Sequence, residues 1–201
     1  KRLKEGNKRY VEDKENPTSD QGLRSSLTGG QQPFAIILSC ADSRVVPEMI
    51  FDCNIGELFV VRVAGNIANT SSIASIEYAV AHLKCKMILV LGHESCGAVT
   101  AAVNGGDNGP NLNHLCDHIK EAVEKGAGKD LAEVVKLNAD LNAKALIAKS
   151  DILRSAVEKE GLIIDSAYYN LGSGKVDFSL IVVYKSNESL GVNDNSDWLK
   201  P

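Results

Sequence analysis

Two short segments, far apart in the chain, carry residue types that bind metal ions and move protons. The first contains Cys40, Asp42 and Arg44, and the second contains His93 and Cys96 with two residues between them. Two thiolates and one imidazole form a mixed sulfur and nitrogen donor set that suits zinc. Three protein ligands leave one tetrahedral position open, as in a catalytic zinc site. The sequence therefore predicts one catalytic Zn²⁺ per chain, held by Cys40, His93 and Cys96.

Both segments directly follow short apolar runs that are typical of strands buried on both faces. Residues 34–38 precede the first segment, residues 87–91 precede the second, and a further run lies at 57–63. Residues 71–83 carry apolar side chains at helical spacing, so strands alternate with helices, which implies parallel strands with right-handed crossovers. Ligands bind beyond the carboxyl ends of such strands, and we expect the two segments to meet at that edge.

The remaining pattern extends this alternation over most of the chain. We predict an α/β fold with a mostly parallel central β-sheet, flanked by helices and preceded by an N-terminal helical arm. Further helices are expected at residues 3–14, 111–125, 130–149 and 151–160, and closing strands at 162–164 and 176–183. The predicted domains are an N-terminal helical arm (1–30), a zinc-binding α/β catalytic domain (31–185) and a C-terminal tail (186–201).

Composition and charge exclude several classes of protein. The 201 residues are 44% hydrophobic and 24% charged, which is ordinary for a folded soluble chain. The net charge of -4 and the lack of a dense basic stripe make nucleic acid and anionic membranes poor partners. No apolar run approaches the roughly 20 residues needed to span a bilayer. Five cysteines without regular close spacing argue against a disulfide framework, so we expect a reducing, cytoplasmic location.

Cys-x-Asp-x-Arg followed by His-x-x-Cys resembles the paired motif of the β-class carbonic anhydrases. The likeness extends through GQQPFAIILSCADSRVVPE, GELFVVRVAGN, SIEYAVAHL and LVLGHESCGAV, roughly residues 31–103. It implies an enzyme that reversibly hydrates carbon dioxide to bicarbonate and a proton by means of a zinc-bound hydroxide. In that mechanism Asp42 and Arg44 are the catalytic pair and control the open metal position.

The same resemblance implies a substrate pocket and an assembly. Gln31, Phe59 and Tyr78 would line a pocket for CO2 and bicarbonate, part of it contributed by a second subunit. We add Gly97, which follows Cys96, to the expected substrate-binding residues. The implied assembly is a homodimer or a higher homo-oligomer of dimers.

The spacing within the first motif allows two roles for its acid. The Asp42 carboxylate can reach the neighbourhood of the metal, where it would accept the proton of bound hydroxide or occupy the fourth position itself. The Arg44 guanidinium can bind that carboxylate with two hydrogen bonds and hold it off the metal. Because two thiolates neutralise the dication, the zinc should be a weaker Lewis acid than with three histidines, and activity should rise across mildly alkaline pH.

Several alternatives remain open. A relative with this fold could hydrolyse carbon disulfide or carbonyl sulfide, or the chain could be a non-catalytic zinc scaffold with Asp42 as the permanent fourth ligand. A redox-active dithiol is disfavoured because the chain has no Cys-x-x-Cys motif.

Other polar positions receive weaker functional interpretations. Some family members bind bicarbonate at a noncatalytic site through a Trp, an Arg and a Tyr, and the matching positions here are Ile37, Arg62 and Tyr169. Ile37 cannot donate the indole hydrogen bond, so we expect no such site. His114 and His118 lie four residues apart on a predicted helix without an evident third ligand, and we expect exposed positions. The three other cysteines are expected to be packing residues: Cys53, Cys85 and Cys116.

Overall fold

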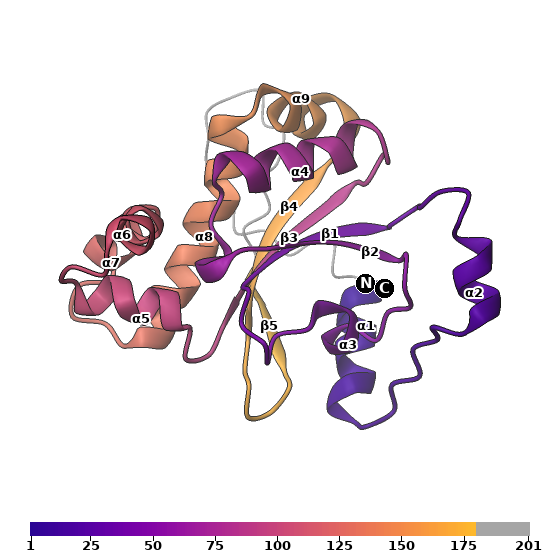
Figure 1. The fold of residues 1–201 in the computed structure, drawn as a ribbon, viewed down its shortest axis with the longest axis horizontal. Coiled ribbons are helices and arrows are strands. Elements are labelled where there is room, and N and C mark those ends of the chain that lie inside the picture. Colours follow the sequence, from indigo (N-terminus) through magenta and orange to yellow (C-terminus); the bar gives the residue numbers. More distant parts are fainter. Residues whose placement is uncertain (180–201) are drawn as a thin grey trace.

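The computed structural model describes residues 1–179, and within them a five-stranded sheet lies between two layers of helices (Figure 1). The strand order is β2-β1-β3-β4-β5, and every neighbouring pair is parallel except β4 and β5. The strands are β1 (Ala35–Ser39), β2 (Leu58–Arg62), β3 (Met87–His93), β4 (Ile163–Tyr169) and β5 (Val176–Ser179). The prediction of a mostly parallel sheet flanked by helices is confirmed.

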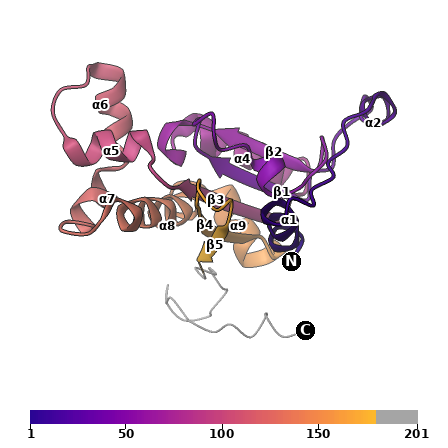
Figure 2. The same cartoon turned by 90° about the horizontal axis from the view of Figure 1, so that it is seen from below.

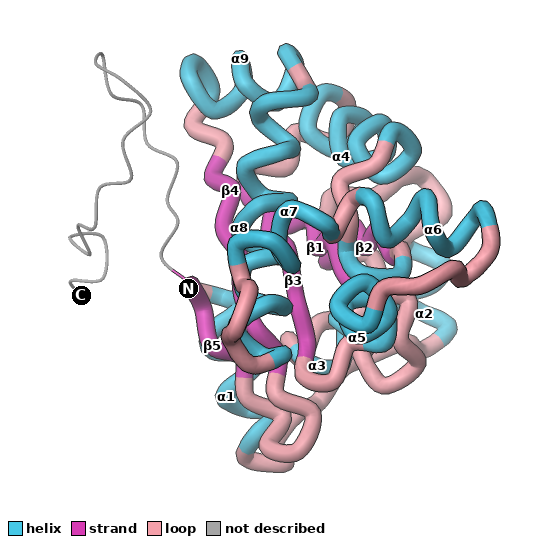
Figure 3. Tube along the Cα trace, turned by 90° about the vertical axis from the view of Figure 1, so that its left-hand side faces the viewer, coloured by secondary structure: helices cyan, strands magenta, loops and turns pink. Residues whose placement is uncertain are grey.

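The helices alternate with the first strands and then follow one another before β4. They are α1 (Arg2–Val11), α2 (Gln21–Ser26), α3 (Pro47–Ile50), the 3-10 turn η1 (Ala64–Asn66), α4 (Thr70–Ala81), α5 (Gly97–Asn104), α6 (Pro110–Asp117), α7 (Lys120–Lys125), α8 (Leu131–Lys149) and α9 (Asp151–Glu160). Figures 1 and 3 place α4 and α9 on one side of the strands and α1 and α3 on the other. Within residues 1–179 no helix is both long and apolar enough to cross a membrane.

Successive side chains of the central strands point to opposite faces, and both faces are buried. In β1, Ile36 and Leu38 join the cluster beneath α4, α8 and α9, whereas Ala35 and Ile37 join the cluster beneath α1 and α3. All five residues of β1 are buried, which explains why the sequence shows a continuous apolar run there. Burial of both faces thus fixes the register in which β1 pairs with its neighbours, and so the positions at which these strands end.

Helix α1 packs on the body of its own chain. Leu3 is buried in the core, and a side chain at Gly6 would collide with the carbonyl oxygen of Phe51. The Asn7 amide donates to the carbonyl of Gly174 and accepts from the N–H of Val176, so it ties the helix to the β4–β5 hairpin. Helix α2 instead projects from the end opposite α5 to α7 (Figure 2). The predicted domain limits at residues 30 and 185 stay predictions.

The structure differs from the predicted elements in the short and the terminal segments. Helices α2 and α3 fall in segments that the sequence pattern does not mark as helical, and residues 111–125 form two helices around the fully buried Ile119. Strand β4 continues to Tyr169 because its aromatic end is buried as well. Strand β5 is antiparallel because a hairpin, and no crossover helix, precedes it. The predicted strand residues 180–183 and the predicted tail at 186–201 lie outside the described residues.

Candidate active site

The two motifs meet at the carboxyl edge of the sheet. Cys40 follows the last residue of β1, His93 is the last residue of the neighbouring strand β3, and Cys96 caps the start of α5. Their three potential ligand atoms lie within 4.8 Å of one another, and all three residues are buried. Within residues 1–179 no other group of three His, Cys, Asp or Glu side chains comes together in this way.

His93 has the hydrogen-bonding state of a metal ligand. Its Nδ1 atom lies 2.9 Å from the carbonyl oxygen of Glu94, so Nδ1 carries the proton and donates it there. Its Nε2 atom is buried and finds no hydrogen-bond partner among the described residues. A buried ring nitrogen without a partner is unfavourable unless its lone pair binds something, and metal-bound histidines are held through the other nitrogen in this way. The imidazole therefore fits a metal ion at Nε2.

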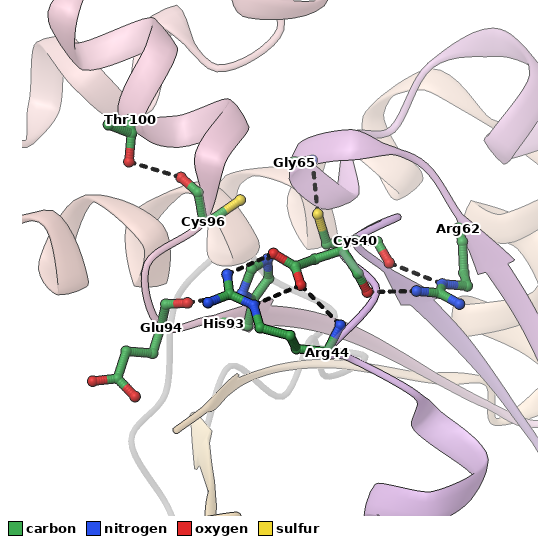
Figure 4. Close-up of polar contacts among 9 residues, drawn as sticks. Cys40, Arg44, Arg62, Gly65, His93, Glu94, Cys96 and Thr100 are labelled. Atoms are coloured by element: carbon green, nitrogen blue, oxygen red, sulfur yellow. Dashed lines mark hydrogen bonds and ion pairs between the residues drawn. The ribbon is translucent and has the colours of Figure 1, made fainter. Parts of the chain in front are cut away.

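The two thiols together lose one proton readily and the second with difficulty. The hydrogen bond from Cys96 lowers the pKa of Cys40, and the same contact, together with burial, raises the pKa of Cys96. The backbone N–H of Gly65 lies 3.4 Å from the Cys40 sulfur and stabilises its thiolate (Figure 4). A divalent ion would remove the conflict, because it binds both sulfurs as thiolates. The donor set of two sulfurs and one nitrogen fits zinc.

Asp42 and Arg44 form a two-pronged ion pair at the rim of this cluster. Arg44 donates from Nε to Oδ1 over 3.0 Å and from Nη2 to Oδ2 over 2.8 Å, and its backbone N–H also donates to Oδ1. The Arg44 guanidinium holds the pKa of the Asp42 carboxyl well below its usual range. Oδ2 of Asp42 lies 4.0 Å from the free Nε2 of His93. The carboxylate therefore stands beside the metal-binding atoms while its charge is bound to Arg44.

Three of the predicted substrate-binding residues lie away from this cluster in the single chain. Phe59 pairs with Ile36, four residues before Cys40, which is about 13 Å along the strand. The Tyr78 ring on α4 lies 6.4 Å from the Phe59 ring and is half exposed, and Gln31 is exposed before β1 begins. Gly97 alone adjoins the cluster, as the first residue of α5. The pocket assignment of all four stays a prediction.

Comparison with known proteins identifies the family. A family model described as carbonic anhydrase matches residues 35–176. The chain belongs to the β-carbonic anhydrase family. It is 40% identical over 187 residues to a carbonic anhydrase of Mycolicibacterium smegmatis, and the aligned region covers 88% of this chain and 90% of the relative. It is 37% identical over 183 residues to carbonic anhydrase 2 of Mycobacterium tuberculosis, and the aligned region covers 87% of this chain and 88% of that relative.

Solved structures agree with this assignment. Tetrameric β-carbonic anhydrases from Sordaria macrospora match with a TM-score of 0.72 and 28% identity, over 81% of this chain and 88% of the relative. The predicted resemblance is therefore confirmed, and the chain is an enzyme of the carbonate dehydratase class.

The sequence did not predict that Arg62 contacts the backbone of the first motif. Arg62 ends β2 and donates to the carbonyl oxygens of Cys40 over 3.0 Å and of Asp42 over 2.6 Å (Figure 4). It thereby holds the backbone of the first motif at both ends of a three-residue stretch. The signal available in the sequence was its place at the end of a strand beside β1.

The other two positions compared with the noncatalytic bicarbonate site are occupied by contacts within the chain. Ile37 is fully buried in β1, and the Tyr169 hydroxyl lies 3.2 Å from the Tyr10 hydroxyl. The absence of such a site stays a prediction.

The remaining candidate residues lie outside the cluster. The rings of His114 and His118 meet edge to face with centroids 5.3 Å apart, and burial lowers the pKa of His118. The buried thiols of Cys53 and Cys85 donate to backbone carbonyls, whereas Cys116 is partly exposed.

Proposed function

We propose that this chain catalyses the reversible hydration of carbon dioxide to bicarbonate and a proton, with Zn²⁺ held by Cys40, His93 and Cys96. The observation that carries the proposal is the unpartnered, buried Nε2 of His93 within 4.8 Å of two thiols. When bound, zinc would lower the pKa of a coordinated water so that hydroxide is available near neutral pH to attack CO2. The two cysteine thiolates would balance the charge of that ion, and the neutral imidazole would supply the third donor atom.

Asp42 would act as an oriented acceptor beside the reacting position. Because Arg44 keeps its pKa low, the carboxylate stays ionised at neutral pH and can only accept hydrogen bonds. Its Oδ2 atom would accept a hydrogen bond from the attacking oxygen and so direct a lone pair of that oxygen toward CO2. Arg44 would hold this geometry through its two side-chain contacts, and Arg62 through its bonds to the carbonyls of residues 40 and 42.

One observation favours a second candidate. Because Oδ2 of Asp42 lies only 4.0 Å from the free nitrogen of His93, a modest side-chain rotation would make it a fourth metal ligand. The chain would then be a closed zinc scaffold without turnover. The bidentate contact with Arg44 opposes that rotation, since both carboxylate oxygens would have to give up charge-assisted hydrogen bonds. We therefore favour the open, catalytic state.

The test is zinc quantitation combined with CO2 hydration measured by oxygen-isotope exchange across pH. We expect one zinc per chain and activity that rises from neutral to mildly alkaline pH, because two thiolates weaken the acidity of the site relative to three histidines. Zinc without exchange at any pH would support the closed scaffold. Headspace assays with carbonyl sulfide and carbon disulfide complete the test, and faster consumption of either gas than of CO2 would contradict the proposal.

We further propose that the active unit is at least a homodimer. Gln31, Phe59 and Tyr78 lie away from the metal cluster of their own chain, and a second subunit would bring such a set to its partner's site. The Sordaria macrospora relatives are described as tetrameric. Light scattering coupled to size exclusion would give the mass, and a fully active monomer would contradict this part of the proposal.

A further inference from the structure

Helix α8 places two asparagine side chains in the protein core. Asn138 and Asn142 lie one turn apart and are only 1% and 5% exposed. The other buried residues of this helix are all apolar: Val134, Val135, Ala139, Ala143 and Leu146. Burying an amide is unfavourable unless its hydrogen bonds are satisfied, so this pair needs a structural reason.

The hydrogen bonds of the pair run to one short segment and between the two asparagines. Asn138 donates from Nδ2 to the carbonyl oxygen of Gly65 over 2.8 Å. Asn142 accepts from the N–H of Ala68 over 2.7 Å, and its own Nδ2 donates to the backbone and side-chain oxygens of Asn138. The two amides therefore support each other and clamp residues 65 to 68, the segment between β2 and α4.

The clamped segment reaches the metal-binding thiols. The N–H of Gly65 donates to the Cys40 sulfur, as Figure 4 shows. Gly65 has a φ of 72°, and a Cβ atom there would lie 2.8 Å from Ile119 and 3.3 Å from Ala98. The backbone of this turn is thus held by its dihedral angle, by close packing and by the amide of Asn138. A continuous set of hydrogen bonds leads from α8 to the sulfur of Cys40.

The geometry points to Asn138 and Asn142 as positioning residues that aim the Gly65 N–H at the Cys40 thiolate and tune how that sulfur binds metal. This inference rests on the metal-binding role proposed above. An N–H donor draws electron density from a thiolate, so the sulfur gives less of it to the metal and the metal stays a stronger Lewis acid. The donor also fixes the position of the sulfur before metal arrives, and we expect this effect on metal affinity to outweigh the weaker electron donation.

The experiment compares Asn138→Ala with Asn7→Ala. Asn7 is also a buried amide, 5% exposed against 1% for Asn138, and it also bonds to backbone groups but lies on the other side of the sheet. Affinity for Zn²⁺ is measured by competition with a chelator, and the thiolate-to-cobalt charge-transfer band is recorded in the cobalt-loaded proteins. We expect about 10–100-fold weaker metal binding and a displaced band in Asn138→Ala. Asn7→Ala should lose thermal stability but keep the metal affinity and the band of the unmodified protein.

The opposite result is equally clear. If Asn138→Ala matches Asn7→Ala in metal affinity and in spectrum, the pair serves packing alone and the inference is wrong. If Asn138→Ala does not fold, Asn142→Ala provides the comparison, because it removes the bond to the N–H of Ala68 and the two bonds that support the Asn138 side chain. We expect it to weaken metal binding relative to Asn7→Ala, and equal affinities would overturn the inference.

A measurement on the unmodified protein tests the sulfur contact directly. With an NMR-active cadmium isotope in the site, the Gly65 amide proton should show scalar coupling to the metal through the Cys40 sulfur. Lack of coupling at Gly65, while other site protons couple, would remove the basis of the inference. Neither the variant comparison nor the NMR measurement involves CO2. A chain that gives the expected result in both experiments but hydrates no CO2 would therefore count against the proposed function alone.

Discussion

The carboxyl edge and the amino-end half of the sheet differ in how closely one chain brings the predicted site residues together. At the carboxyl edge, Cys40, His93 and Cys96 converge within one chain, and nearby backbone groups are held by hydrogen bonds. Toward the amino end, Phe59 lies on β2, an edge strand with no second neighbouring strand within residues 1–179, and Tyr78 on α4, whose ring is near that of Phe59, stays half exposed. This contrast supports the proposal that one chain holds the metal and that an assembly completes the substrate pocket.

Removal of a metal ligand is the most severe test of the site at the carboxyl edge. His93→Ala takes away the one nitrogen donor, and two buried thiols alone cannot satisfy a catalytic zinc. We expect zinc content near zero and no measurable hydration, checked by elemental analysis and isotope exchange. His118→Ala, which changes a partly buried histidine outside the cluster, should keep both. Full zinc content in His93→Ala would place the metal elsewhere.

Arg44→Ala separates metal binding from turnover at the same edge. Without its guanidinium, Asp42 is free to approach the metal and occupy the fourth position. We expect kcat to fall by roughly 100-fold or more, because displacement of a group at a reacting centre by about 1 Å can cost that much. Zinc content should be unchanged.

The control for Arg44→Ala is Arg154→Ala, which removes an arginine that pairs with Asp151 on the surface of α9. It should leave both kcat and zinc content as they are. Loss of zinc in Arg44→Ala would mean that the arginine maintains the metal site and does not control its open position.

Gly65→Ala tests how rigidly the backbone beside Cys40 is held at the carboxyl edge. The alanine would have to adopt a φ of 72° and its Cβ would meet Ile119 at 2.8 Å, so we expect the free energy of unfolding to fall by about 2–4 kcal/mol. Gly161→Ala is the matched control, since Gly161 has a φ of 71° with nothing within 4 Å of the added carbon. It should lose only about 1–2 kcal/mol. Equal losses in chemical denaturation would show that the packing around Gly65 yields easily.

The sequence predicted the parts of the fold and site that follow from local pattern. Buried strands appear as apolar runs, and parallel strands bring their carboxyl ends to one edge, so the meeting of Cys40 with His93 and Cys96 could be expected from the sequence alone. The direct contact of Asp42 with Arg44 follows from a spacing of two residues. These features depend on few long-range choices.

The features that were missed depend on tertiary contacts with backbone groups. Arg62 and Asn138 act through hydrogen bonds to carbonyl oxygens, which every residue offers, so no residue type in the sequence marks the partner. Two asparagines four residues apart on the apolar face of a helix were the available signal, and it points to a buried polar contact without naming it. Helices as short as α2 and α3 likewise carry too few residues to show a period.

Tyr78→Ala tests the amino-end half of the sheet and should have the smallest effect on activity of these variants. If a second subunit places this ring at its partner's site, hydration should fall several-fold while zinc content is unchanged, because the ring shapes the pocket and does not touch the metal ligands of its own chain. Ile152→Ala, which shortens a 47% exposed side chain on α9, is the control and should keep full activity. Activity per zinc and mass by light scattering are measured together. A Tyr78→Ala dimer with full activity would return the pocket to a single chain, and the two parts of the sheet would then no longer differ in the way that we infer.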